Sequence, residues 1–161
     1  MFVMRISATN DFAADADEVH AMFTDEDFLN RVCTATGALS HTARSDGTIT
    51  FTERVLPTPS LVEKFAGPTL TLTETLTWAP RQADGTREGR LDLTVAGLPV
   101  TLTAQVKLAP GGRGATVVYA GNLVVDIPWL GRKLEEAAAP VLTEALNTQQ
   151  RAGEDYLAEQ L

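Results

Sequence analysis

The sequence predicts an α+β protein in which a curved antiparallel sheet of about six or seven strands wraps around a long C-terminal helix. Segments in which apolar and polar residues alternate, the pattern of half-buried strands, recur between Phe2 and Val125. Two short helical patterns follow the first of these segments. From Pro128 the apolar residues recur every three or four positions, as in one long amphipathic helix. A sheet with one wet face must cover its apolar face, and only this helix is long enough to do so.

The first strand and the two short helices occupy the N-terminal quarter. The alternating apolar residues of the strand are Phe2, Met4, Ile6 and Ala8. Asp15, with Glu18 three residues on, is typical of a capped helix start. The helix that follows buries Val19 and Phe23, and a second short helix ends near Gly37.

The next hairpin allows two registers around Ser45-Asp46-Gly47. A three-residue turn with Gly47 in the left-handed position pairs His41 with Phe51 and keeps the apolar residues on one face, whereas a two-residue turn at Asp46-Gly47 mixes the faces. The hydrophobic pattern therefore predicts the three-residue turn. In this register His41, Phe51 and Glu53 lie on the inner face.

The central strands have clearer faces. From 69 to 78, apolar residues including Leu72, Leu76 and Trp78 alternate with threonines, which suit a solvated pleated surface. Strands over 87–96 and 99–109 are joined at Gly97-Leu98, and a two-residue turn there sets the apolar pairs Leu91/Ala104, Leu93/Leu102 and Val95/Val100 on one face. The last strand, 115–125, is apolar on both faces, so its inner face stays open.

The C-terminal helix carries an apolar stripe, formed by Ile127, Leu130, Leu134, Ala138, Val141, Ala145, Ala152 and Tyr156. Pro140 falls inside it and should kink or interrupt the helix, because proline removes one backbone hydrogen bond. The small side chains of residues 137–139 leave volume between this helix and the sheet, which large side chains of the sheet either fill or leave open as a cavity. Trp78 and Trp129 are predicted to pack in the core.

Composition narrows the classes of protein and partner. A chain of 161 residues fits one domain over 1–161. The net charge of −8 argues against nucleic acids and anionic membrane surfaces as partners. No stretch approaches the roughly 18 apolar residues of a membrane span, and the N-terminus does not resemble a signal peptide, so a cytoplasmic location is expected. A monomer and a homodimer both remain open.

Polar residues on the predicted inner face are the only candidates for chemistry. His41, Glu53, Glu74 and Asn10 could orient the head group of a ligand, or they could lie near strand ends and reach solvent. The spacing of the two histidines is not that of a metal site, and the single cysteine, Cys33, excludes an intramolecular disulfide. No metal, cofactor or catalytic residue is therefore assigned.

The order of elements resembles the helix-grip fold of the START-like (SRPBCC, Bet v 1-like) superfamily, which includes lipid-transfer domains, plant pathogenesis-related proteins and polyketide cyclases. The resemblance covers the whole chain. Its local marks are residues 12–19, 127–131 and the closing helix with Leu134-Glu135. Within that superfamily the chain is most similar to a bacterial family of uncharacterised START-like domains, which share the Leu56-Pro57 and Trp78 neighbourhoods. The resemblance implies a cavity between sheet and helix.

The leading hypothesis is a non-catalytic carrier or sensor that binds a lipid-like or polycyclic hydrophobic molecule in this cavity. The alternatives are a cyclase- or hydrolase-type enzyme with His41, Glu53 or Glu74 as acid or base, and a protein-binding module. The residues predicted to line the cavity are His41, Phe51, Glu53, Leu72, Glu74, Leu76, Trp78, Leu93, Leu102, Leu134 and Val141.

Overall fold

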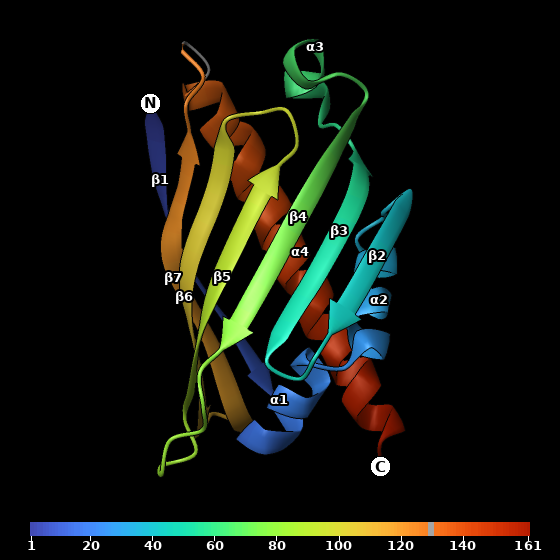
Figure 1. The fold of residues 1–161 in the computed structure, drawn as a ribbon, viewed down its shortest axis with the longest axis vertical. Coiled ribbons are helices and arrows are strands. Elements are labelled where there is room, and N and C mark those ends of the chain that lie inside the picture. Colours follow the sequence, from blue (N-terminus) through green and yellow to red (C-terminus); the bar gives the residue numbers. More distant parts are fainter. Residues whose placement is uncertain (129–130) are drawn as a thin grey trace.

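A computed structural model of the protein describes residues 1–128 and 131–161. Within these residues the predicted α+β helix-grip order is confirmed: one strand, two short helices, six further strands and a long C-terminal helix (Figure 1). The strands are β1 (Phe2–Phe12), β2 (Ser40–Ser45), β3 (Ile49–Pro57), β4 (Thr69–Trp78), β5 (Arg87–Val95), β6 (Val100–Gly111) and β7 (Gly114–Val125). The helices are α1 (Ala16–Phe23), α2 (Glu26–Ala35), the single 3₁₀ turn η1 (Ser60–Val62), α3 (Glu63–Ala66) and α4 (Gly131–Glu159).

The strands form one antiparallel sheet in the order β1-β7-β6-β5-β4-β3-β2. Its inner face is crossed along its length by α4, and α1 and α2 cover the end at the bottom of Figure 1. We call this the lower end, and the opposite end, next to α3, the upper end. The N-terminus of α4 lies at the upper end and its C-terminus at the lower end, so one helix contacts both.

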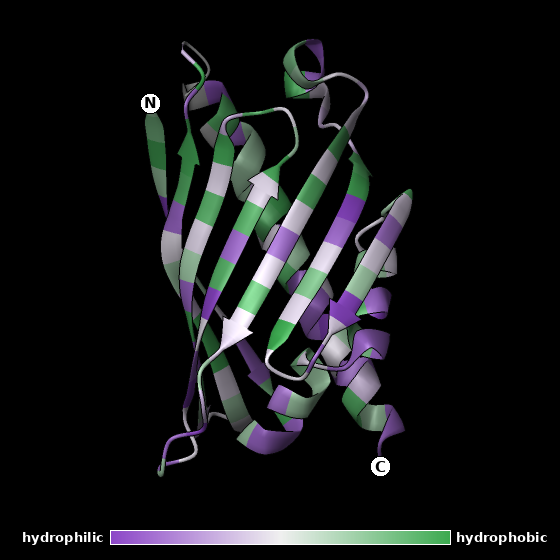
Figure 2. Ribbon diagram, viewed as in Figure 1, coloured by the Kyte–Doolittle hydropathy of each residue, from purple (hydrophilic) through white to green (hydrophobic). Residues whose placement is uncertain are grey.

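The predicted faces of the central strands are confirmed. On β4 the threonines point outward, while Leu76 and Trp78 are buried. Between β5 and β6, Leu93 lies opposite Leu102, as the two-residue turn requires. Figure 2 shows the resulting alternation of hydrophobic and hydrophilic residues along these strands.

The predicted register of the β2–β3 hairpin is wrong. Arg44 pairs with Phe51, and the chain turns at Gly47-Thr48 rather than through a three-residue loop. The cause is local, because the carboxylate of Asp46 accepts hydrogen bonds from the backbone N–H groups of Thr48 (2.9 Å) and Ile49 (2.6 Å). These hydrogen bonds also lower the pKa of Asp46. Gly47 has a φ of +90°, which glycine adopts without steric cost.

This register exchanges the two faces of β3 relative to the prediction. Thr50, Thr52 and Arg54 point inward and are buried. Phe51 and Glu53 lie on the outer face instead, where the guanidinium of Arg44 sits 5.3 Å from the centroid of the Phe51 ring. The prediction that Phe51 and Glu53 line the inner face is therefore wrong.

Two hydrophobic clusters divide the space between the sheet and the helices. The lower cluster is aromatic, with Phe12, Phe23, Phe28, Trp78 and Tyr156 at its centre. Its rings meet mostly edge to face, with centroids 5.6–6.4 Å apart, a favoured geometry for aromatic pairs. The upper cluster is aliphatic, built on Leu102, Ala104, Leu123 and Val125. The lower end is thus filled by large rings and the upper end by smaller side chains.

Helix α4 continues through Pro140 without a break, so of the two predicted effects, a kink or an interruption, the interruption does not occur. The proline deprives the carbonyl of Glu136 of its usual helical partner, but both residues are exposed and that carbonyl can bond to water. Trp129 and Leu130, for which the sequence predicted packing roles, lie outside the described residues.

Candidate ligand-binding site

A cavity of about 180 Å³ lies at the upper end, between the sheet and the N-terminal half of α4. Every residue that lines it is apolar. They are Leu70, Leu72, Leu93, Val95, Leu98, Val100, Leu102, Leu123, Val125 and Ile127 from the sheet and its connections, Pro59, Val62, Phe65 and Ala66 from the η1–α3 segment, and Leu134, Ala137, Ala138, Val141 and Leu142 from α4.

The strand register builds the floor of this apolar cavity. Leu93, Leu102 and Leu123 are direct neighbours across three adjacent strands. Alternate residues of a strand share a face, so a strand can place two apolar side chains on the floor. On β4, for example, Leu70 and Leu72 both line the cavity. The floor is therefore a continuous aliphatic surface.

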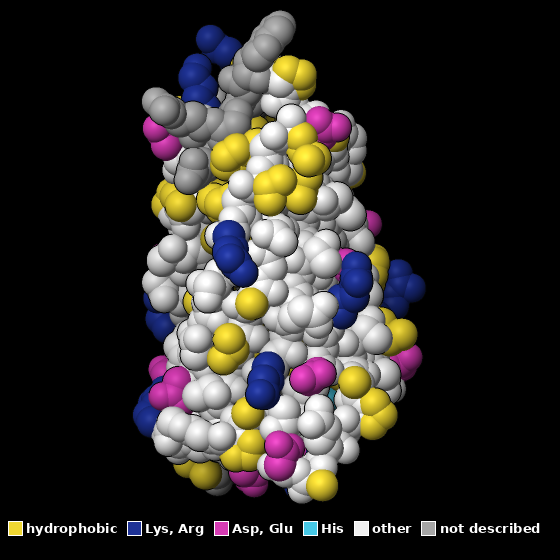
Figure 3. All heavy atoms as spheres, turned by 90° about the vertical axis from the view of Figure 1, so that its left-hand side faces the viewer, with side chains coloured by type: hydrophobic (Ala, Val, Ile, Leu, Met, Phe, Trp, Pro, Cys, Tyr) yellow, Lys and Arg dark blue, Asp and Glu magenta, His cyan; other side chains and the backbone are white. Residues whose placement is uncertain are grey.

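The wall and mouth come from α4 and from the η1–α3 segment. Ala137 and Ala138 keep the wall thin at the point where larger side chains would fill the space. Phe65 and Val141 line the cavity and are 55% and 49% exposed, which places them at its opening. Seen from the β1 edge, hydrophobic side chains gather most densely toward the same upper end, while charged side chains are scattered over the whole face (Figure 3).

A second cavity, of about 50 Å³, lies farther toward the lower end and has a mixed lining. We call it the polar chamber. Its polar side chains are Thr50, Thr52, Glu74, Tyr119 and Gln149. Its apolar side chains include Phe28, Leu76 and Leu91, and Cys33 also contributes. Burial raises the pKa of the Cys33 thiol, so the uncharged thiol is the form that faces the chamber.

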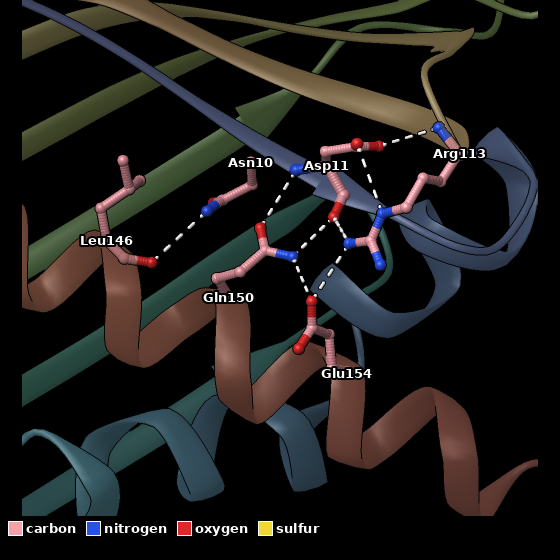
Figure 4. Close-up of polar contacts among 6 residues, drawn as sticks. All are labelled: Asn10, Asp11, Arg113, Leu146, Gln150 and Glu154. Carbon is pink, nitrogen blue, oxygen red and sulfur yellow. Dashed lines mark hydrogen bonds and ion pairs between the residues drawn. The ribbon is translucent and has the colours of Figure 1, made fainter.

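A hydrogen-bond network beneath α4 forms one side of the polar chamber. The amide nitrogen of Gln149 donates to the Tyr119 hydroxyl (2.7 Å) and to Oδ1 of Asn10 (2.9 Å). Asn10 is 2% exposed, which confirms that it points inward, and its own amide donates to the carbonyl of Leu146 (3.4 Å; Figure 4). Burial raises the pKa of Tyr119 far above its ordinary value, so this phenol stays protonated.

Glu74, which also lines the polar chamber, belongs to an ion pair. The guanidinium of Arg54, on β3, lies 3.4 Å from the carboxylate of Glu74, on β4, and also donates to the hydroxyl of Thr36 (3.2 Å). The Arg54 side chain is only 10% exposed, so its charge requires these partners. Sequence reasoning did not anticipate this pair, because the predicted register pointed Arg54 outward.

A separate group of polar contacts fixes the C-terminal half of α4 to the sheet edge (Figure 4). The side-chain amide of Gln150 accepts from the backbone N–H of Asp11 (3.0 Å) and donates to the carbonyl of the same residue. Arg113 bridges the Asp11 and Glu154 carboxylates. Hydrogen bonds from Gln150 and Arg113 lower the pKa of Glu154. The contacts occupy one end of the β1 edge and hold the helix there.

The structure divides the predicted site residues among five places. Five line the apolar cavity: Leu72, Leu93, Leu102, Leu134 and Val141. Glu74 and Leu76 line the polar chamber. Trp78 is 4% exposed and packs in the lower cluster against His20, with ring centroids 5.4 Å apart. His41 contacts Asn30 of α2 (3.1 Å), and Phe51 and Glu53 lie outside.

The predicted acid–base candidates therefore do not converge. His41, on β2, contacts α2, and Glu53 lies on the outer face of the sheet. Only Glu74 lines the polar chamber. Among the described residues, no group of three or more His, Cys, Asp or Glu side chains is placed to hold a metal ion. In the same part of the chain, no helix is long and apolar enough to cross a membrane.

Sequence reasoning missed four polar residues of the chamber: Thr50, Thr52, Tyr119 and Gln149. For Gln149 a signal existed, since it sits at the helical spacing between Ala145 and Ala152, inside the apolar stripe. A lone amide in such a stripe indicates a polar partner beneath the helix. The threonines could not be found, because the assumed register pointed them outward.

A curved antiparallel sheet closed by a long C-terminal helix, with a cavity between them, defines a helix-grip protein, the fold that the resemblance implied. The chain belongs to the family described as "Protein of unknown function (DUF2505)", which matches residues 7–157. No curated protein matches the sequence.

Solved structures share this fold at low sequence identity. TTHA0849 from Thermus thermophilus is 15% identical, with a TM-score of 0.64 over 98% of both chains. The Zhui aromatase/cyclase from Streptomyces sp. R1128 is 15% identical, with a TM-score of 0.61 over 94% of this chain and 91% of its own. A STAR-related lipid transfer protein from Xanthomonas axonopodis is 18% identical, with a TM-score of 0.55 over 92% and 85%.

Proposed function

We propose that this protein binds a hydrophobic small molecule in the apolar cavity and acts as a non-catalytic carrier or sensor. The observation that carries the proposal is the lining, which offers no hydrogen-bonding side chain and so suits hydrocarbon. Moving hydrocarbon from water onto such a surface is favourable by about 25 cal/mol per Å² buried. Similar structures of a lipid transfer protein and an aromatase/cyclase add support at the level of the fold.

The cavity volume limits what fits without movement. Apolar cavities of about 150 Å³ accept benzene, so about 180 Å³ accommodates one ring or a short aliphatic chain. Pockets for drug-sized ligands reach roughly 300–1,000 Å³. A larger guest would therefore have to displace the N-terminal half of α4. Among the side chains of α4 that the structure describes, the polar contacts to other elements involve Leu146 or later residues, which favours movement of the N-terminal half.

The carrier proposal is favoured over the enzyme because the titratable groups that line the cavities do not form a catalytic set. Glu74 is paired with Arg54, and the Tyr119 phenol is held protonated by burial. A general base must be free to take a proton from the bound molecule. The protonated phenol of Tyr119 cannot do so, and the carboxylate of Glu74 is neutralised by Arg54.

The test is a pair of matched substitutions on α4. Ala138→Phe places a ring in the apolar cavity, whereas Ala139→Phe places the same ring on the exposed side of the helix. We expect Ala138→Phe to weaken toluene binding by about tenfold or more, because it fills the binding volume, and Ala139→Phe to leave the affinity unchanged. Toluene binding is followed by chemical-shift changes of the Leu and Val methyl groups, with Leu102 and Leu123 as reporters.

Native mass spectrometry then identifies natural guests. After incubation with cell extract, the wild-type protein and Ala139→Phe should carry an apolar adduct that Ala138→Phe lacks. If toluene shifts no cavity methyl group in the wild-type protein and the extract supplies no adduct, the proposed function is wrong.

A further inference from the structure

The polar chamber adjoins the apolar cavity along the same face of the sheet. On β4, Leu72 lines the cavity and Glu74 the chamber. On β5, Leu93 lines the cavity and Leu91 lines the chamber. Residues two apart on a strand are separated by about 7 Å, which an alkyl chain spans easily. A single elongated molecule can therefore contact both spaces.

The sheet between the two spaces carries small residues. Ala104 on β6 and Gly121 on β7 lie opposite one another, at the level between Tyr119 of the chamber and Leu123 of the cavity. Neither has a side chain large enough to form a partition on these two strands. The floor thus continues from the cavity toward the chamber.

The chamber contains hydroxyl groups without protein partners. Thr50 and Thr52 are 4% and 8% exposed, and both line the chamber. Among the described residues, neither hydroxyl makes a hydrogen bond to protein. A hydroxyl can both donate and accept, so these two are available to a polar group that enters the chamber.

The remaining chamber groups mainly offer acceptors. Both hydrogens of the Gln149 amide are used, toward Tyr119 and Asn10, which leaves its carbonyl oxygen as the free atom. Glu74 presents carboxylate oxygens and receives only the 3.4 Å contact from Arg54. A polar group that can donate a hydrogen bond is therefore the best match to Gln149 and Glu74.

The charges of Glu74 and Arg54 determine which polar group of a ligand fits the chamber. A carboxylate ligand would face Glu74 and could not donate, while the nearby cation, Arg54, is engaged by Glu74 and Thr36. An ammonium group would approach Arg54 and lose its hydration in a space of only about 50 Å³ among aromatic and aliphatic side chains. A neutral hydroxyl both donates and accepts, at a smaller desolvation cost.

We infer that the polar chamber binds the hydroxyl group of a neutral hydrocarbon alcohol whose hydrocarbon part lies in the apolar cavity. The inference rests on the proposed function and specifies its ligand class. It distinguishes this site from one for fatty acids or for pure hydrocarbons.

The test compares four probes of similar length by isothermal titration calorimetry: 1-octanol, octyl methyl ether, octanoate and octylammonium. Because the probes differ in hydration, the change from wild type to variant is the decisive quantity. Thr52→Val removes one chamber hydroxyl at nearly constant shape. Thr73→Val is its matched control, since Thr73 is the residue before Glu74 and points to the outer face.

We expect 1-octanol to bind the wild-type protein most tightly of the four probes. Thr52→Val should weaken 1-octanol about fivefold, the effect of one hydrogen bond, with little change for the ether. Thr73→Val should change neither. Glu74→Gln removes the negative charge and releases Arg54, so octanoate should bind that variant at least about fivefold more tightly than the wild-type protein.

Two failures are distinguishable. If all four probes bind with similar affinity and Thr52→Val affects them equally, or if octanoate or octylammonium binds most tightly, the alcohol inference is wrong and the apolar cavity remains a binding site. If no probe binds the wild-type protein, both the inference and the proposed function are wrong.

Discussion

Replacing Gly121 with alanine is expected to destabilise the protein by about 3 kcal/mol or more, a large share of a typical folding free energy. A Cβ atom at Gly121 would overlap the backbone oxygen of Thr103 and lie 2.5 Å from the Cα atom of Ala104. These are backbone atoms of the neighbouring strand β6, which cannot rotate away as a side chain can. Relief requires β6 and β7 to separate where they form the floor between the two cavities.

Urea unfolding followed by circular dichroism measures the effect. Two controls isolate the close backbone approach. Ala120→Val adds more volume at the preceding residue of the same strand, on the exposed outer face, and should change stability by less than about 0.5 kcal/mol. Gly89→Ala meets the Trp78 ring at 3.1 Å, a contact that a small ring shift can relieve, and should have an intermediate effect. If Gly121→Ala unfolds at the same urea concentration as the wild-type protein, the two strands are not so close there.

The sequence predicted the central strands well because two independent signals agreed. On β4 the alternation of leucine and threonine assigns the faces, since one set is apolar and the other suits water. On β5 and β6 the two-residue turn and the apolar pairs select the same register, so Leu93 faces Leu102. Agreement between turn length and pattern leaves no second arrangement of similar energy.

The β2–β3 hairpin was mispredicted because its hydrophobic pattern and its turn favour different registers. The prediction followed the hydrophobic pattern, whereas the turn sets the register. The hydrophobic pattern of β3 favours Ile49, Phe51 and Val55 as inward residues. The Asp46 side chain instead stabilises a tight turn at Gly47-Thr48, which points them outward. The inner face of β3 carries polar groups because it borders the polar chamber and the Arg54–Glu74 pair. A rule that places apolar residues inside fails where the interior itself is polar.

The candidate site was accessible to sequence reasoning only in its apolar part. Aliphatic residues on a known face predict a lining, as for Leu72 and Leu102, but the empty volume depends on how closely a helix approaches the sheet. The composition of the polar chamber depends on which face of β7 points inward, because that face carries Tyr119. Both faces of β7 carry apolar residues, so the sequence pattern does not distinguish them. Packing, rather than local pattern, decides that choice.

Replacing Tyr156 with phenylalanine is expected to destabilise the protein by about 1.5–3 kcal/mol at neutral pH. The hydroxyl of Tyr156 donates to the carboxylate of Asp25 at 2.6 Å, and Asp25 also caps the N-terminus of α2. The substitution leaves the Tyr156 ring in its edge-to-face contact with Phe28, so the loss reports the hydrogen bond. This bond links the C-terminal end of α4 to α2, at the end of the molecule opposite the apolar cavity.

The same bond predicts a distinctive pH dependence. Burial, followed by hydrogen bonding and charge repulsion from Asp25, raises the pKa of Tyr156 from about 10 to about 12. A group whose pKa is higher in the folded state stabilises that state fully below its unfolded value and loses this contribution as pH rises through the folded value. The stability difference between the wild-type protein and Tyr156→Phe should therefore persist up to about pH 10 and disappear as pH approaches about 12.

Urea unfolding of both proteins from about pH 7 to about pH 12 checks this expectation. The other tyrosine, Tyr119, also has a raised pKa, but it is present in both proteins and cancels in the difference. Replacement of Asp25 with asparagine retains an acceptor but removes the negative charge, so it should lower the pKa of Tyr156 and move the loss of stability toward about pH 10. A difference that stays constant across this range would show that Tyr156 and Asp25 do not form the bond.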